Sequence, residues 1–163
     1  MKNTSKTATA TLEKLRAAAM PAGYFKIEKN GAMMPLWFEM IDSRKPASGV
    51  TLELWSVAHW YTQEGDVMRD PDVEILRAHP AVGPARWFPV SFRQDPMIWS
   101  VSAELGPDLL PRKFYPRRQR DLCAFMTTWC KNLEHQHGET IKAAADPVPE
   151  ALENLKLFIN APA

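Results

Sequence analysis

Carboxylates gather between residues 59 and 74, in the string HWYTQEGDVMRDPDVE. Oxygen ligands this close in sequence suit Mg²⁺, Ca²⁺ or Mn²⁺. With His59 as a base, the segment 66–74 could serve a metal-dependent hydrolase through Asp66, Asp70, Asp72 and Glu74. The spacing lacks the calcium-loop pattern, however, and Asp, Gly and Asp-Pro are equally typical of a solvated turn. We therefore expect no metal and no cofactor, and favour a protein that is not an enzyme.

A basic segment, RKFYPRRQR, spans residues 112–120 and contains no acid. Its cations are Arg112, Lys113, Arg117, Arg118 and Arg120. Cations neutralise phosphates and aromatic rings stack on bases, so this segment could bind nucleic acid. It could equally be the solvated start of a helix. Arginines near a helix N-terminus oppose the helix dipole, which keeps a binding role open.

Other side chains that could do chemistry point to structural roles. Cys130, Glu134 and His137 share a helical spacing, with His135 beside them, but no zinc motif such as CxxC or HExxH occurs. We expect a buried cysteine and exposed histidines there. Tryptophans are frequent on the extended segments, and indole seldom buries completely. Some of Trp55, Trp60 and Trp87 could therefore border a partner-binding surface.

Composition and charge limit the class of protein. The chain has 163 residues and a formal charge of +1, which gives no general attraction to nucleic acid or an anionic membrane. We expect one domain over residues 1–163, with 1–6 and 161–163 loose. Its two cysteines, Cys123 and Cys130, are spaced too far apart along a helix for a disulfide. No long apolar run is present, so we predict a cytoplasmic protein without membrane contact.

The periodicity of apolar residues predicts helices at both ends of the chain and strands between them. A helix is expected over 7–19 and another over 117–137, where Gly138 is a suitable stop, with a short final helix from Pro149. Six extended segments lie between, over 23–29, 32–42, 50–61, 67–78, 86–93 and 97–104. Their short connections favour antiparallel pairing. The sequence therefore predicts an α+β fold, an antiparallel meander of about six strands covered by terminal helices.

Two turn signals define hairpins within this meander. Asn30-Gly31 is a strong two-residue hairpin signal, and Glu64-Gly65 turns the chain between the two longest strands. Asp70-Pro71 interrupts the second of those strands and predicts a bulge. Residues 106–116 are expected to form a proline-rich connector.

Three strings resemble an uncharacterised bacterial family found on plasmids and conjugative elements. Residues 59–72 resemble its mark H-[YW]-x-x-Q-N-G-D-L-M-R-D-P-[ED], although Glu64 stands where the family has Asn. Residues 86–95 are similar to its W-[YF]-P-x-x-[YF]-x-N-D segment, and residues 30–36 to its N-x-G-F-M-P-L segment. The resemblance implies an accessory protein of a mobile genetic element, without an assigned reaction.

The sequence favours a non-catalytic interaction protein, with counter-defence as its most concrete form. We expect a protein partner at the end of the central hairpin. The predicted binding residues are His59, Tyr61, Gln63, Asp66, Arg69 and Asp70. Nucleic-acid binding through 112–120 and metal-dependent hydrolysis through 66–74 are the alternatives.

Overall fold

A computed structural model describes residues 1–28, 31, 33–46 and 48–146. Within them the element order is α1 (Lys6–Ala19), β1 (Tyr24–Ile27), β2 (Leu36–Arg44), β3 (Thr51–Gln63), β4 (Asp66–His79), β5 (Arg86–Gln94), β6 (Ile98–Val101), β7 (Ala103–Leu105), β8 (Pro111–Phe114) and α2 (Pro116–Ala145). Strands β1 to β6 form one six-stranded sheet in sequence order, and every neighbouring pair is antiparallel. The α+β fold and its meander are therefore confirmed. The short final helix predicted from Pro149 lies outside the described residues.

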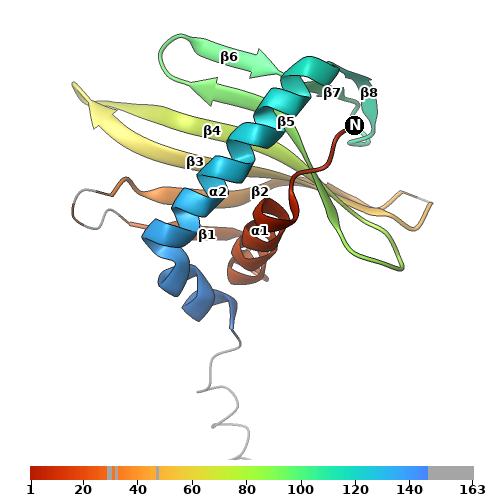
Figure 1. The fold of residues 1–163 in the computed structure, drawn as a ribbon, viewed down its shortest axis with the longest axis horizontal. Helices are drawn as coiled ribbons and strands as arrows, with labels where there is room; N and C mark the ends of the chain where they lie inside the picture. Colours follow the sequence, from red (N-terminus) through yellow and green to blue (C-terminus); the bar gives the residue numbers. More distant parts are fainter. Residues whose placement is uncertain (29–30, 32, 47, 147–163) are drawn as a thin grey trace, which may run out of the picture.

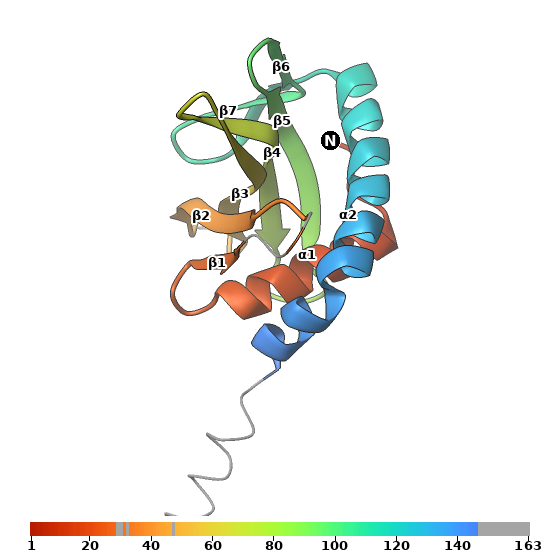
Figure 2. The ribbon, with the colours of Figure 1, turned by 90° about the vertical axis from the view of Figure 1, so that its left-hand side faces the viewer.

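Both helices cover the same face of the sheet. Figure 1 shows α2 running obliquely in front of the strands with α1 beside it, and Figure 2 shows the helices together on one side of the sheet. Alternate strand residues point to this face, among them Phe38, Trp55, Val57 and Ile75, and all four are fully buried. The principal core therefore lies between the sheet and the two helices.

Capping and burial explain where the helices begin and end. Ser5 caps α1, and its hydroxyl accepts a hydrogen bond from the Ala8 amide at 3.2 Å. In α2, the predicted stop at Gly138 is wrong, because the helix continues to Ala145. Ile141 lies beyond that glycine and is fully buried. Its burial outweighs the cost of a helical glycine, about 1 kcal/mol.

The central hairpin is irregular where the sequence predicts it. Ala58 pairs with Asp72 and Trp60 with Arg69, so β4 carries one extra residue around Asp70-Pro71. The predicted bulge is confirmed. At the end of the hairpin, Glu64 and Gly65 both have positive φ, 52° and 91°. This left-handed conformation suits glycine and is unfavourable for a glutamate.

The last strands differ from the prediction. The extended segment 97–104 is divided at Ser102 into β6 and β7, and β8 lies in the predicted connector. The Ser102 hydroxyl donates to the carbonyl of Pro89 at 2.7 Å, which ties the chain to β5 at the point of division. Strands β7 and β8 then pair as a separate two-stranded sheet.

The N-terminal residues make specific contacts, although the sequence suggested a loose segment. The Thr4 amide donates to the carbonyl of Trp87 at 2.9 Å. The Lys2 amide donates to the side-chain oxygen of Gln119 in α2 at 2.7 Å. These bonds hold the segment against β5 and α2. None of the described helices is long and apolar enough to cross a membrane.

Candidate functional site

One face of the sheet is covered by helices, and part of the other is open. Strand pairing places Trp37, Ala58, Asp72, Arg93 and Trp99 side by side across five strands. Side chains alternate between faces, and this row lies opposite the buried Phe38 and Val57. Trp37 is 37% exposed and Trp99 is 76% exposed. We call this surface, from β1 to β6, the open face.

A chain of aromatic and cationic side chains crosses the middle of the open face. The Arg69 guanidinium lies over the Trp60 ring, 4.9 Å from its centroid. Trp60 in turn contacts Trp37, with ring centroids 6.0 Å apart, and the Lys26 ammonium lies 4.3 Å from the Trp37 ring centroid. Cation–aromatic contacts of this kind fix large side chains in place while leaving one side accessible.

A polar hollow of about 370 Å³ lies on the β6 side of Arg69. We call it the Arg69 hollow. It is lined by Arg69, Asp72, Glu74, Ser91, Arg93, Asp95, Pro96, Met97, Ile98 and Trp99. Its apolar wall comes from the β5–β6 turn and β6, and its polar floor from β4 and β5.

The carboxylates of the Arg69 hollow are already paired. Asp95 accepts hydrogen bonds from the Arg69 amide at 3.0 Å and from Arg93 Nε at 2.7 Å. The bond from the Arg69 amide is the main reason that the pKa of Asp95 lies below its ordinary value. Asp72 accepts from Ser56 at 2.7 Å, and Glu74 from Ser91 at 2.8 Å. Carboxylates whose oxygens are already hydrogen-bonded within the protein hold this surface in shape.

An apolar hollow of about 440 Å³ lies on the β1 side of Trp60. We call it the Trp60 hollow. Its lining is formed by Lys26, Glu28, Met33, Met34, Pro35, Trp37, Trp60, Tyr61, Thr62 and Val67. Val67 is 62% exposed. Trp60 and Arg69 therefore stand between an apolar and a polar depression on one surface.

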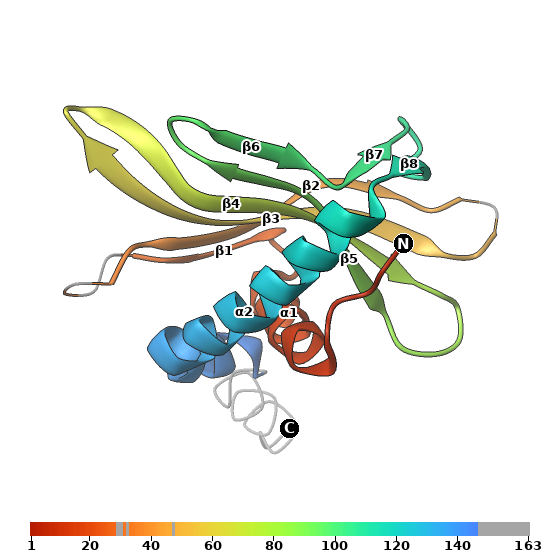
Figure 3. The ribbon, with the colours of Figure 1, turned by 45° about the horizontal axis from the view of Figure 1, so that its top comes forward.

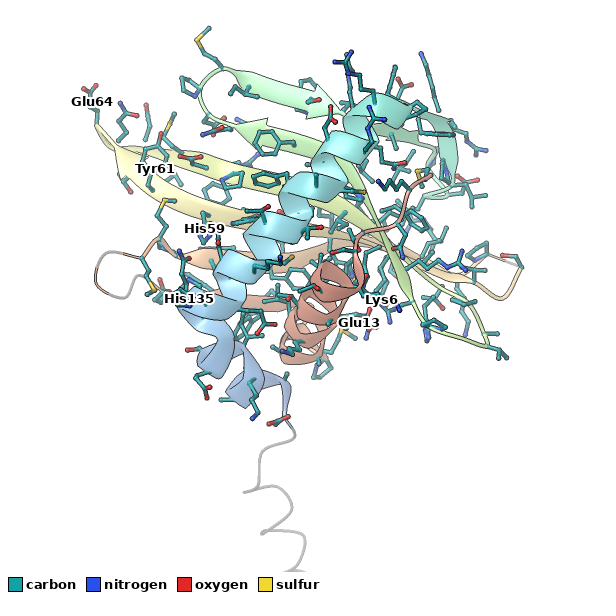
Figure 4. The ribbon with its side chains drawn as sticks, in the orientation of Figure 1. Lys6, Glu13, His59, Tyr61, Glu64 and His135 are labelled. Carbon is teal, nitrogen blue, oxygen red and sulfur yellow. The ribbon has the colours of Figure 1, made fainter. Side chains whose placement is uncertain are left out.

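The structure separates the six predicted binding residues. Gln63 and Asp66 are exposed and form the last pair of the hairpin, while Tyr61, Arg69 and Asp70 are half-buried. Arg69 alone of the six contributes to the centre of the open face. Figure 4 shows His59 lying close to α2 rather than at the end of the hairpin.

His59 is buried beneath α2, with only 5% of its surface exposed. Its Nδ1 lies 3.1 Å from the carbonyl oxygen of Pro35, and its ring packs edge-on against Trp129 at 5.5 Å. Burial lowers the pKa of His59, and burial likewise lowers that of His137, whose ring centroid lies 6.4 Å away. The position of His59 is a correction, because we expected it on the exposed surface.

The carboxylates proposed for a hydrolase do not converge. Asp66 lies opposite Gln63 at the hairpin end, whereas Asp72 lies opposite Ala58 in the middle of the sheet. Among the described residues, no three His, Cys, Asp or Glu side chains are placed to hold one metal ion. Cys130, Glu134 and His137 are likewise not placed to hold one metal ion. Burial raises the pKa of the Cys130 thiol to about 12.

The basic segment lies at the opposite end of the sheet from the hairpin tip. Its five cations are exposed, and they belong to β8 and the start of α2. Tyr115 lies between two of them, with Lys113 4.8 Å and Arg118 4.9 Å from its ring centroid. Arg112 pairs with Asp108 at 2.7 Å.

Sequence reasoning missed Arg93, and it did not single out Trp37 and Trp99 among the tryptophans of the extended segments. Each belongs to an extended segment that was recognised, but the open face becomes visible only when the register between strands is known. Strand alternation was the available signal, since Trp99 and Val101 alternate with Ile98 and Ser100.

The fold and the open face define a class of protein: an α+β domain whose six-stranded antiparallel sheet is covered by helices on one face and partly accessible on the other. The chain belongs to the family described as a domain of unknown function (DUF6908), whose model matches residues 6–138. No curated protein and no solved structure matches the chain.

Proposed function

We propose that this protein is a cytoplasmic, non-catalytic binding domain that engages a protein partner through the open face. The contact would centre on Trp60 and Arg69 and extend to Trp37, Arg93 and Trp99. The end of the β3–β4 hairpin, with Gln63 and Asp66, would form its rim. In its finer form the proposal is an accessory protein of a mobile genetic element, with a counter-defence role.

The carrying observation is that exposed tryptophan and arginine side chains gather on the sheet face opposite α1 and α2, the two helices of the described residues. Tryptophan, tyrosine and arginine dominate the energetics of protein interfaces, particularly next to pockets that a partner side chain can fill. The Trp60 hollow could receive an apolar side chain and the Arg69 hollow a polar one. Met97 and Trp99, 89% and 76% exposed, extend the apolar surface to β6.

The charges of the open face favour a protein over a polyanion. Arg69 and Arg93 are accompanied by Asp72, Glu74 and Asp95 in the same hollow. These carboxylates would repel a nucleic-acid backbone. A protein surface with both signs of charge can match such a pattern.

A site-specific photo-crosslinker tests the proposal. We would place it at Val67, on the open face, and at Lys131, on the exposed side of α2, in separate variants. In cells that carry the natural partner, the Val67 variant should yield one discrete adduct, and Arg69→Ala in that variant should remove it. Equal adducts from both positions, or an adduct indifferent to Arg69→Ala, would contradict the surface assignment.

Nucleic-acid binding through the basic segment is the second candidate. It is favoured by one observation: the five cations of the segment are exposed, and two of them lie over the ring of Tyr115. If it holds, affinity for a DNA or RNA oligonucleotide should fall steeply with salt. Replacing Arg117 and Arg120 by glutamine should reduce both the affinity and the salt slope. The absence of a shifted oligonucleotide band at low salt would exclude this candidate.

A further inference from the structure

A hollow larger than the Arg69 hollow and the Trp60 hollow lies at the other end of the open face, where the β7–β8 sheet packs against β3, β4 and β5. Its volume is about 810 Å³. We call it the Phe88 hollow. The residues around it are Met1, Asn3, Leu52, Leu76, Ala78, Arg86, Phe88, Pro111, Arg112, Lys113 and Phe114. Figure 3 shows β7 and β8 beside this part of the sheet, away from the long β3–β4 hairpin.

The floor of the Phe88 hollow is apolar. Leu52 and Leu76 belong to a second buried cluster, and Phe88 and Ala78 pack against it. On the β8 side, every residue from Pro111 to Phe114 is exposed, and Phe114 keeps 45% of its surface accessible. Leu52 and Leu76 are themselves buried, at 4% and 1% exposure. The apolar surface that a ligand can reach in the hollow therefore belongs to the half-buried Ala78 and Phe88 and to Phe114.

The rim of the Phe88 hollow carries charge of one sign. Arg86, Arg112 and Lys113 line it, and no lining residue is acidic. Arg86 makes no ion pair within the described part of the chain. Arg112 pairs with Asp108, which leaves part of its guanidinium fork accessible. Such a rim differs from the Arg69 hollow, where acids and bases alternate.

We propose that the Phe88 hollow binds a small amphipathic anion, namely a carboxylate on a medium-length acyl chain. The acyl chain would lie over Ala78, Phe88 and Phe114, and the carboxylate would accept hydrogen bonds from Arg86 and Lys113. The volume falls within the usual range of ligand pockets, about 300–1,000 Å³. Apolar side chains floor the hollow and cations rim it, which matches a ligand with an apolar chain and an anionic end.

This site is independent of the proposed partner surface. The Phe88 hollow shares no lining residue with the Arg69 hollow or the Trp60 hollow. A partner could therefore bind the open face whether or not an acyl carboxylate is bound. Each proposal can fail without affecting the other.

Titration of the full chain with octanoate, followed by calorimetry and by amide chemical shifts, tests the proposal. We expect saturable binding with shifts confined to the elements that line the hollow, namely the first residues of the chain, the starts of β3 and β5, the end of β4, and β8. Octanamide has the same chain without charge and should bind about tenfold more weakly, because charge-assisted hydrogen bonds are lost. Rising salt should weaken octanoate binding and leave octanamide binding unchanged.

Matched variants distinguish octanoate binding in the Phe88 hollow from a nonspecific attraction of the anion to surface cations. The double variant Arg86→Gln/Lys113→Gln should weaken octanoate binding about tenfold or more. The control Arg117→Gln/Arg120→Gln removes the same charge from exposed positions outside the hollow and should leave affinity unchanged. Equal effects of the two variants, or shifts spread over the surface, would overturn the proposal. Binding of oligo(dT) in the hollow without binding of octanoate would also overturn it and assign the surface to nucleic acid.

Discussion

The guanidinium of Arg69 lies over the indole ring of Trp60, 4.9 Å from its centroid, and pairs with Asp72 at 3.5 Å. The two contacts fix one arginine between an aromatic and an acidic neighbour. The Arg69 side chain nevertheless remains 34% exposed, so one side of its guanidinium faces solvent. A cation held in this way is available to a partner without needing to be ordered on binding.

Replacing Arg69 by glutamine should leave the fold intact. The lost cation–aromatic contact and partly exposed ion pair should together cost less than about 1 kcal/mol of unfolding free energy. Chemical denaturation of Arg69→Gln against the wild type measures this change. A loss of several kcal/mol would show that Arg69 has a structural role, and its variants could not then report on binding.

The buried ion network under α1 should respond very differently. Arg77 donates to Glu13 at 2.7 Å and lies 3.5 Å from Glu53, and the side chains of Arg77 and Glu53 are 5% and 6% exposed. Arg77→Met should lower the unfolding free energy by about 3 kcal/mol, because Glu13 loses its hydrogen-bonding arginine and the buried Glu53 keeps only one arginine, Arg16. Arg44, exposed at the end of β2, gives the matched control Arg44→Met, which should change stability little. Similar denaturation midpoints for both variants would contradict the assignment.

The histidines between β3 and α2 make stability depend on pH near neutrality. Burial lowers the pKa of His59 and of His137, so the unfolded chain binds more protons than the folded one. Stability is therefore fully present above their ordinary pKa, about 6.5, and decreases as the pH falls below it. We expect the unfolding temperature to drop between about pH 7.5 and about pH 5.5.

A pair of histidine variants isolates this effect. His137→Leu should reduce the loss of stability across that pH range, whereas His135→Leu, on the exposed side of α2, should leave it unchanged. Glu13 and Glu53 do not contribute there. Burial alone would raise the pKa of each, but hydrogen bonds from arginine and tryptophan, together with the charges of the arginines, hold the pKa below 4.5. An equal pH dependence in both variants would exclude His137 as a source.

Cys130 should be unreactive in the folded protein. Its thiol is fully buried, and burial raises its pKa to about 12, so almost no thiolate forms at neutral pH. Iodoacetamide should not modify Cys130 in native protein at about pH 8 and should modify it in denaturant. Mass spectrometry of the labelled peptides measures both outcomes. Rapid native labelling would indicate that α2 opens locally.

Local patterns in the sequence were sufficient to predict the sheet and its helices. Period-two alternation and short turns defined the strands, and the stripe formed by Leu122, Met126, Trp129 and Leu133 defined α2. These signals are local, because each depends on residues within one element. Strand β8 escaped prediction because its sequence, PRKF, is short, charged and begins with proline, so no alternation was visible.

The candidate site depended on long-range packing and was predicted only in part. His59 shares strand parity with Trp55 and Val57, which indicates the covered face, but its place near the hairpin end suggested exposure. Only the position of α2 over β3 decides between the two. The pairing of Arg77 with Glu13 likewise joins residues 64 positions apart. Contacts of this kind follow from the packing of elements and carry no local signal.

The β3–β4 hairpin extends beyond the strands on both sides of it. The last pair with β2 involves His59 and the last pair with β5 involves Asp72, whereas β3 and β4 remain paired to Gln63 and Asp66. Backbone amides in this two-stranded extension can exchange their hydrogens through a local opening that leaves the core intact. A partner that adds contacts along the extension would slow this exchange. Deuterium uptake between Tyr61 and Met68 would therefore report occupancy of the open face without a probe attached to the protein.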